Sequence, residues 1–240
     1  MNRFADGEKT NRPCPYCGGV LAGSTDSRSP VWDHVLWANE SVVVIPTRGA
    51  LVEGWLLAIP REHVLASREL SSSQADDLRA AVSWAEAALG RHYGSVAVFE
   101  HGAARLGTVV GCGVDHAHIH VVPLGFDLID AARNHPMSGC LDWQRFSNWE
   151  AAYSSLRPAE GYLAVQTSGP DVWLGRGDIP SQFFRRVIAA EIGCPDAFDW
   201  RGDPRVDQVE RTIARLAGQD DDSKSRGGIQ APRLCIGAGV

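Results

Sequence analysis

The sequence contains no long hydrophobic run. No window approaches the roughly 20 consecutive apolar residues that a membrane-spanning helix requires, and the first residues, MNRFADGEKTNR, contain no apolar signal core. At 240 residues the chain is long enough for one large domain with a real hydrophobic core. We therefore expect a cytoplasmic protein that has no membrane partner.

An excess of positive charge is also missing. The chain carries 23 Lys and Arg against 29 Asp and Glu, which gives a formal net charge of -6. Proteins that hold DNA or RNA through backbone phosphates need a clustered basic surface. We therefore expect no nucleic-acid partner, whereas small anionic ligands remain compatible with the composition because a local site can be positive on an acidic protein.

Cysteines are few for the length of the chain. Six unevenly spaced cysteines do not form the dense disulfide framework of a small secreted protein, and only Cys14 and Cys17 have the spacing of a pair. Such a pair serves either a dithiol redox centre or half of a tetrahedral zinc site. A redox centre needs its first cysteine at a helix N-terminus after a strand, but this pair follows a charged leader and runs into Gly18 and Gly19. Zinc is therefore favoured, and it requires two more ligands.

Residues 115–124, DHAHIHVVPL, place three histidines at every second position. Alternate side chains of a β-strand share one face and lie roughly 6.6 Å apart. The pattern predicts that His116, His118 and His120 lie on one face and that the apolar residues between them face a core. Three neutral rings beside a core would repel one another on protonation and need several partners, so the row indicates a functional site.

Strands and helices are expected on both sides of this row. Apolar runs separated by Asn39-Glu40 predict a hairpin, a stripe of apolar residues after an N-capping serine predicts one long helix, and a turn at Ser168-Gly169-Pro170 predicts a second hairpin. The expected strands cover residues 35–38, 41–45, 55–59, 95–100, 161–166 and 172–174, and the expected helices cover residues 71–89, 179–192 and a segment that starts at 203.

Three motifs together resemble one family. His116-Ala117-His118-Ile119-His120-Val121-Val122 matches the pattern His-φ-His-φ-His-φ-φ, where φ is apolar, and resembles the signature of the histidine triad superfamily. LLAIPREH at 56–63 resembles the strand and the basic-x-His sequence found upstream in these proteins, and CPYC resembles the Cys-x-x-Cys of their zinc-binding members. The resemblance covers residues 14–124. It implies an α+β protein with a HIT-like fold, in which helices pack on a five-stranded antiparallel sheet, and usually a homodimer.

The resemblance also implies a structural zinc ion. Its ligands would be Cys14, Cys17, His63 and His116, and thiolate and imidazole are the groups that structural zinc sites prefer. The closed site would attach the N-terminal segment to the sheet and fix one end of the histidine row. Zinc would take no part in the chemistry.

The same resemblance gives the other two histidines catalytic roles. His118 would attack the α-phosphorus of a nucleotide and form a nucleotidyl-imidazole, which requires that its other nitrogen donate to a fixed acceptor such as a backbone carbonyl. His120 would contact the phosphate and assist the leaving group. Backbone N–H groups near Gly111, Cys112 and Gly113 would stabilise charge on the phosphate oxygens.

His120 is the third histidine of the row. In this position the chain resembles the hydrolases of the family, since related transferases carry Gln there. We therefore expect a nucleotide phosphohydrolase that cleaves a phosphoanhydride, phosphoester or phosphoramidate of a small-molecule nucleotide through nucleotidyl-His118. One alternative is a nucleotidyltransferase or phosphorylase that passes the nucleotidyl group to phosphate or to a sugar phosphate. Another is a non-catalytic nucleotide-binding regulator.

Several neighbours differ from the family pattern. Gly111-Cys112-Gly113 stands where hydrolases usually carry Gly-Gln-Ser/Thr, so a hydroxyl is missing at Gly113. Cys112 is either a reactive thiol beside His118 or a small residue in a tight phosphate loop. Thr47 stands where a ribose-binding Asp is usual, and it can bond one hydroxyl where a carboxylate would bond two.

The chain divides into four parts by composition and by the extent of the resemblance. We expect a flexible leader at 1–12, the core with its zinc site at 13–124, a mixed α/β extension at 125–217, and a disordered tail at 218–240. Glu100 and His101, at the end of the fourth expected strand, either replace lost substrate contacts or cap the loop. Arg185 and Arg186 are expected to be surface charges or partners of Asp and Glu.

Overall fold

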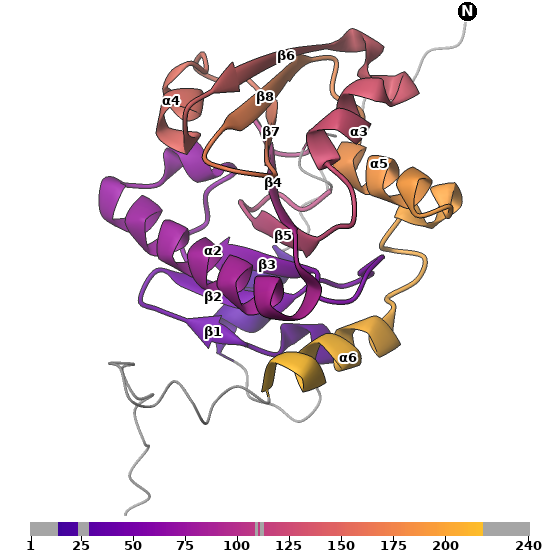
Figure 1. Cartoon of the computed structure of the whole chain (residues 1–240). Coiled ribbons are helices and arrows are strands. Elements are labelled where there is room, and N and C mark those ends of the chain that lie inside the picture. Colours follow the sequence, from indigo (N-terminus) through magenta and orange to yellow (C-terminus); the bar gives the residue numbers. More distant parts are fainter. Residues whose placement is uncertain (1–13, 24–28, 109, 111–112, 218–240) are drawn as a thin grey trace, which may run out of the picture.

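The computed structural model describes residues 14–23, 29–108, 110 and 113–217 (Figure 1). The expected leader at 1–12 and tail at 218–240 lie outside the described residues, as do Gly111 and Cys112 of the expected phosphate loop. Within the described part, none of the helices combines the length and the apolar character needed to cross a membrane.

Eight strands of the described residues form one sheet, in the order β1-β2-β3-β5-β4-β7-β8-β6, and all of its pairs are antiparallel. The strands are β1 Trp37–Ala38, β2 Val42–Pro46, β3 Leu56–Pro60, β4 Val96–Gly102, β5 Ile119–Pro123, β6 Leu141–Phe146, β7 Tyr162–Gln166 and β8 Val172–Gly177. An α+β fold with an antiparallel sheet and packed helices is therefore confirmed. The prediction of five strands is wrong for the complete sheet.

The extra strands come from the C-terminal extension. The first five, β1 to β5, lie within residues 37–123, and β7 then pairs with β4 over five residue pairs from Val98↔Gln166 to Gly102↔Tyr162. An unpaired edge at β4 would leave a row of backbone N–H and C=O groups open. β7 occupies that edge with an almost fully buried apolar strand, and β8 and β6 continue the sheet beyond it.

Helices cover both faces of the sheet. They are α1 Pro15–Gly18, α2 Ser72–Tyr93, α3 Leu128–Asn134, α4 Trp149–Ser154, α5 Phe183–Glu191 and α6 Val206–Ala217, with short 3-10 turns at Val20–Ala22, Val31–Asp33, Ser67–Glu69, Pro136–Cys140 and Pro195–Phe198. A capping box of Ser71 and Gln74 begins α2 at the predicted place. The helix ends at Gly94 (φ +86°), later than predicted, because Gly90 continues the helix.

The sheet therefore separates two apolar layers. On one face Leu56, Val98 and Val121 pack against the stripe of α2, which is seen lying across the strands in Figure 1. On the opposite face Phe99 and Val122 pack against α3 and α5. Alternation along the strands assigns Val98 to the first layer and Phe99 to the second, as a period of two requires.

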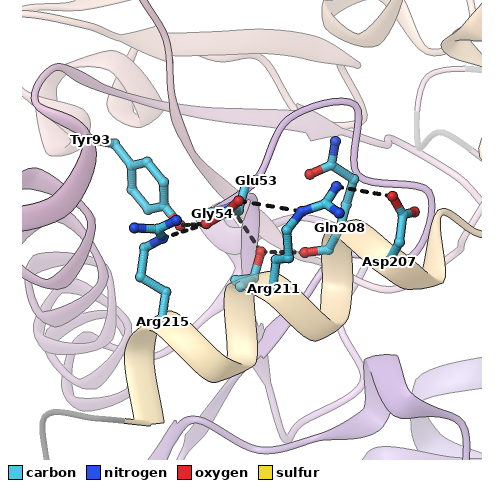
Figure 2. Close-up of polar contacts among 8 residues, drawn as sticks. Glu53, Gly54, Tyr93, Asp207, Gln208, Arg211 and Arg215 are labelled. Carbon is cyan, nitrogen blue, oxygen red and sulfur yellow. Dashed lines mark hydrogen bonds and ion pairs between the residues drawn. The ribbon is translucent and has the colours of Figure 1, made fainter.

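α6 returns to the core through polar contacts around Glu53 (Figure 2). The Glu53 carboxylate accepts from the Tyr93 hydroxyl at 2.8 Å and pairs with Arg215 at 2.5 Å and with Arg211 at 3.5 Å. The backbone N–H of Gly54 donates to the buried Thr212 hydroxyl at 2.8 Å. These contacts hold the end of the described chain against the loop that precedes β3.

Candidate functional site

Cys14, Cys17, His63 and His116 come together at one end of the histidine row. One ligand atom from each lies within 4.8 Å of all the others, so the four form a group that could hold a metal ion. Cys14 caps the single helical turn of α1, His63 follows β3, and His116 lies in the segment before β5. The sequence predicted this set, and the fold joins its parts across as many as 102 residues.

The geometry of this group fits zinc. The Sγ atoms of Cys14 and Cys17 lie 3.4 and 3.5 Å from His116 Nδ1, and Cys17 Sγ lies 3.3 Å from His63 Nδ1. Zinc bonds of about 2.0 to 2.3 Å at tetrahedral angles place ligand atoms roughly 3.5 Å apart. His116 Nε2 lies 2.8 Å from the Pro60 carbonyl, so its proton is on Nε2 and Nδ1 is free to ligate.

A dithiol redox centre would use the same two cysteines. Cys14 caps α1, as the first cysteine of such a centre would, but two imidazoles complete a four-ligand group around the thiols. Both sulfurs also contact imidazole nitrogens, and neither is in a disulfide. The arrangement therefore favours metal ligation over thiol exchange.

His118 is held in one tautomer by the backbone. Its Nδ1 lies 2.7 Å from the carbonyl oxygen of His116, which can only accept, so Nδ1–H donates and the lone pair is on Nε2. Burial lowers the pKa of His118 to about 4, and the backbone hydrogen bond opposes this only in part. The ring is therefore neutral near pH 7, with Nε2 available as a nucleophile.

His120 is held in the opposite tautomer by a tryptophan. The indole N–H of Trp55 donates to His120 Nδ1 at 3.0 Å, so the proton of the neutral ring is on Nε2. Burial first, and then the positive charge of nearby groups, lowers the pKa of His120. Among the described residues, the buried Nε2 has no hydrogen-bond partner. His120 therefore presents an N–H donor, whereas His118 presents an acceptor, and their ring centres are 4.9 Å apart.

The three histidines do not all lie in the strand. β5 begins at Ile119, so only His120 belongs to it, and His116 and His118 precede it in an extended segment. The predicted strand that carries all three is therefore too long. The Ala117 N–H donates to the Val64 carbonyl and does not take part in the hydrogen bonds of β5. In this segment His116 points toward the cysteines, whereas His118 and His120 face a cavity.

A cavity of about 300 Å³ opens over His118 and His120, a size at the lower end of small-molecule sites. Thr47 lines it, as do aromatic side chains from α1, from the turn before β1 and from the extension. The lining includes Tyr16, Trp32, Arg48, Val114, Arg185 and Trp200. Thr47 thus lies where a bound ligand could reach it.

The predicted phosphate loop is described only at Gly113. This residue has φ +77°, a backbone conformation that favours glycine. Gly113 immediately precedes Val114 in the cavity wall. The predicted roles of Gly111 and Cys112 concern positions outside the described residues.

Glu100 and His101 have internal partners. Glu100 is fully buried and accepts from Tyr153 and Tyr162 hydroxyls, each at 2.7 Å, and from the Ser67 backbone N–H at 2.7 Å. Burial raises the pKa of its carboxyl. These contacts tie α4 and β7 of the extension to the core.

His101 lies behind His120. Its Nε2 accepts from the Phe184 N–H at 3.3 Å, and its ring centre is 6.0 Å from that of His120. Burial lowers its pKa to about 3. His101 therefore supports the site from the core and does not line the cavity.

The expectation that Arg185 is a surface charge is wrong. Its side chain is buried, lines the cavity and lies over the Trp55 ring with 5.0 Å between guanidinium carbon and ring centre. Its N–H groups donate to the carbonyls of Phe198 at 2.7 Å and Gly49 at 2.6 Å. Arg186 instead stacks on Phe198 at 3.5 Å and donates to the Ser181 carbonyl.

Trp55 and Trp200 are among the contributors to the site that were not predicted from the sequence. Trp55 fixes the tautomer of His120, and Trp200 forms part of the cavity wall from the extension. The signal for Trp55 was its position directly before an apolar strand, since a buried indole N–H needs an acceptor. No local pattern distinguishes Trp200 from other tryptophans of the extension.

Comparison with known proteins gives structural similarity only. No protein-family model and no curated protein sequence matches the chain. Three similar solved structures are a HIT family hydrolase from Clostridium thermocellum (22% identity, TM-score 0.36, covering 49% of this chain and 95% of that one), a hypothetical histidine triad nucleotide-binding protein from Sulfolobus tokodaii strain 7 (11%, 0.38, 83% and 94%) and a uridylyltransferase (12%, 0.41, 91% and 94%). These identities are below 25% and these TM-scores below 0.5, so we base the function on the residues of this chain.

Proposed function

We propose that the chain is a nucleotide hydrolase of the histidine triad type, which cleaves a nucleoside phosphate linkage through a nucleotidyl-His118 intermediate. The observation that carries the proposal is the pair of opposite tautomers. His118 offers an unprotonated Nε2 and His120 offers a protonated Nε2, side by side and facing one cavity. A nucleophile and a hydrogen-bond donor in this arrangement suit transfer of a phosphoryl-centred group.

In the first step, His118 Nε2 attacks the α-phosphorus. A P–N bond forms as the bond from phosphorus to the leaving group breaks, and the leaving atom takes the electron pair. His120 Nε2–H donates a hydrogen bond to the phosphate or to the departing atom. The His116 carbonyl accepts from His118 Nδ1–H and so stabilises the ring as it gains positive charge.

In the second step, a water molecule attacks the same phosphorus. The P–N bond breaks, its electron pair returns to His118 Nε2, and the proton of the water leaves to solvent or to the departed group. The products are a nucleoside monophosphate and the free leaving group. The cycle restores both tautomers, because the backbone carbonyl and Trp55 that define them have not moved.

Zinc, held by Cys14, Cys17, His63 and His116, would have a structural role in this proposal. It would cross-link the start of α1, the loop after β3 and the segment before β5. His116 would then be fixed through Nδ1 by the metal and through Nε2 by Pro60. Since the carbonyl of His116 orients His118, the metal site would support the nucleophile without touching substrate.

The homodimer that the family resemblance implies stays a prediction. Sedimentation analysis of the purified chain would determine its oligomeric state.

A panel of nucleotide conjugates tests the function. The chain is incubated with dinucleoside polyphosphates, nucleoside phosphoramidates and nucleotide sugars, with and without inorganic phosphate, and the released nucleotides are quantified. Hydrolysis predicts nucleoside monophosphate whether or not phosphate is added, and no release with His118→Ala. Nucleoside diphosphate that appears only with phosphate would identify the phosphorylase alternative. Equal turnover by His118→Ala would contradict the proposed nucleophile.

A further inference from the structure

Arg48 lies in the wall of the cavity with a charged donor that has no partner. Its Nε is buried, and no atom of the described residues accepts a hydrogen bond from it. The guanidinium instead contacts ring faces, with its carbon 4.9 Å from the ring centre of Trp32 and 5.3 Å from that of Trp200. A buried donor without an acceptor destabilises a fold, so a partner for Arg48 is expected inside the cavity.

The backbone on both sides of Arg48 is fixed. The Thr47 N–H donates to the Trp55 carbonyl at 2.9 Å, and the Gly49 N–H donates to the Pro204 carbonyl at 2.9 Å. Rotation of the Arg48 side chain out of the cavity would also break its contacts with the two tryptophan rings. A ligand that uses Arg48 therefore meets a side chain whose position is set before binding, which lowers the entropic cost of the contact.

Asp33 offers the opposite hydrogen-bonding character in the same wall. It follows Trp32 in the 3-10 turn Val31–Asp33, which packs against β2 and α6, and it lines the cavity. Desolvation raises the pKa of its carboxyl, and within the described chain no ion pair joins it to Arg48. A carboxylate only accepts and a guanidinium only donates. One wall thus combines an acceptor and a donor that do not satisfy each other.

Guanine has edges that complement both groups. Its N7 and O6 accept, and an arginine fork binds them bidentately, whereas its N1–H and its N2 amino group donate, which suits a carboxylate. Adenine has an amino donor in place of O6, so it would face the donors of Arg48. Uracil offers one acceptor to the fork and one donor to the carboxylate. A planar base also suits the rings of Trp32 and Trp200 in this cavity.

We propose that Arg48 and Asp33 contact the base of the substrate and select guanine nucleotides. Arg48 donates to O6 and N7, and Asp33 accepts from N1–H and from the N2 amino group. This inference rests on the proposed function, because it names the base of the nucleotide whose α-phosphorus His118 attacks. All three side chains line the same cavity, so one bound nucleotide can contact them together.

Nucleoside monophosphates test this selection without turnover, because they are end products of the proposed hydrolysis. Dissociation constants for GMP, IMP, UMP and AMP are measured by calorimetry. We expect the unsubstituted chain to bind GMP roughly tenfold or more tightly than AMP and UMP, and IMP with an intermediate affinity, because hypoxanthine keeps O6, N7 and N1–H but lacks the N2 amino group.

Substitution of Arg48 should act through the base alone. Arg48→Ala should weaken GMP roughly tenfold or more, since a bidentate contact is lost, and AMP less than about twofold. Arg79→Ala is the matched control and should change neither affinity, because Arg79 is exposed on α2 and pairs with Asp76. Equal weakening of GMP and AMP by Arg48→Ala would overturn the base contact and indicate a phosphate contact.

Asp33→Asn tests the second contact through a gain of binding, which a merely structural role would not produce. The asparagine amide can donate to the C2 carbonyl of xanthine, whereas a carboxylate cannot. We expect XMP to bind more tightly to Asp33→Asn than to the unsubstituted chain, and GMP to bind more weakly. Unchanged or weaker binding of XMP would overturn the role of Asp33.

The unsubstituted chain gives a readout that does not depend on the folding of any variant. Equal affinity for GMP and AMP, or tighter binding of UMP than of GMP, would overturn the selection of guanine. If adenine and guanine substrates form the adduct at His118 equally well, only the inference about the base fails. If the chain neither binds nor cleaves any nucleotide, the proposed function fails with it.

Discussion

The indole N–H of Trp55 donates to Nδ1 of His120 at 3.0 Å, and both side chains are buried. This bond places the proton of His120 on Nε2, the nitrogen that faces the cavity. Fixed hydrogen-bond donors stabilise developing charge without reorganisation during the reaction. In the proposed mechanism, Trp55 is thus a positioning residue that acts through His120.

Trp55→Phe should lower kcat about tenfold or more while changing KM little. Phenylalanine keeps an aromatic ring but cannot donate, so His120 would populate both tautomers. The ¹⁵N chemical shifts of the His120 ring report the tautomer directly, and we expect a single Nε2–H form only with Trp55. Phe99→Leu is the control, because Phe99 stacks on His120 at 4.4 Å without a hydrogen bond. An unchanged His120 tautomer in Trp55→Phe would refute the positioning role.

Removal of the cysteine ligands should remove the metal. We expect about one zinc per chain in the purified protein and none after Cys14→Ser with Cys17→Ser. Because structural zinc sites contribute directly to folding, the melting temperature should fall in the double variant, and chelation should lower it in the unsubstituted chain. Cys194→Ser, at an exposed free thiol, should change neither property. Zinc bound at full stoichiometry in the double variant would contradict the ligand set.

Protonation of buried His101 should lower the stability of the fold in acid. Its pKa is about 3 in the folded chain, against about 6.5 when unfolded. Between these values the unfolded state binds more protons, so the free energy of unfolding falls as pH falls, by about 1.4 kcal/mol per pH unit for this residue. The contribution of His101 to the free energy of unfolding is therefore fully present above pH 6.5 and is lost progressively as pH falls toward 3.

Urea unfolding at pH 7.5 and pH 5.0 measures this effect. His101→Gln retains an acceptor for the Phe184 N–H but has no proton to gain, so its stability should change less between the two pH values than that of the unsubstituted chain. His101→Gln also removes a positive charge that acts on His120, so the difference between the two proteins includes this coupling. The same pH dependence in both proteins would show that His101 is not the responsible group.

Glu100→Gln should loosen the extension. The amide nitrogen of glutamine would face the hydroxyls of Tyr153 and Tyr162 or the N–H of Ser67, all of which donate to the carboxylate. Loss of a buried acceptor costs about 1 to 3 kcal/mol per unsatisfied group. Hydrogen exchange of the β7 amides should accelerate, whereas exposed Glu210→Gln on α6 should have no effect. Unchanged stability would show that this contact does not hold the extension.

Local patterns were sufficient to predict much of the core. A period of two in the histidine row and the apolar runs before it predicted the strands, and an N-capping serine predicted the start of α2. The second hairpin was predicted as well, since β7 and β8 surround the turn at 168–170. The metal group was predicted in two steps. The spacing of the two cysteines favoured zinc, and the family resemblance supplied the two histidines.

Long-range packing decided the rest. β6 was missed because its side chains are half-buried or exposed, so LDWQRF has no continuous apolar run. Arg185 was misjudged because its burial depends on the carbonyl of Gly49, which is 136 residues away.

The central claim is that His118 becomes covalently nucleotidylated. The chain is mixed with a radiolabelled dinucleoside polyphosphate, quenched in alkali to preserve P–N bonds, digested and sequenced by mass spectrometry. We predict one nucleotidyl group on the peptide that contains residues 115–124, located at His118, and none in His118→Ala. Turnover of the same substrate with no adduct, or with the adduct at another residue, would contradict the mechanism.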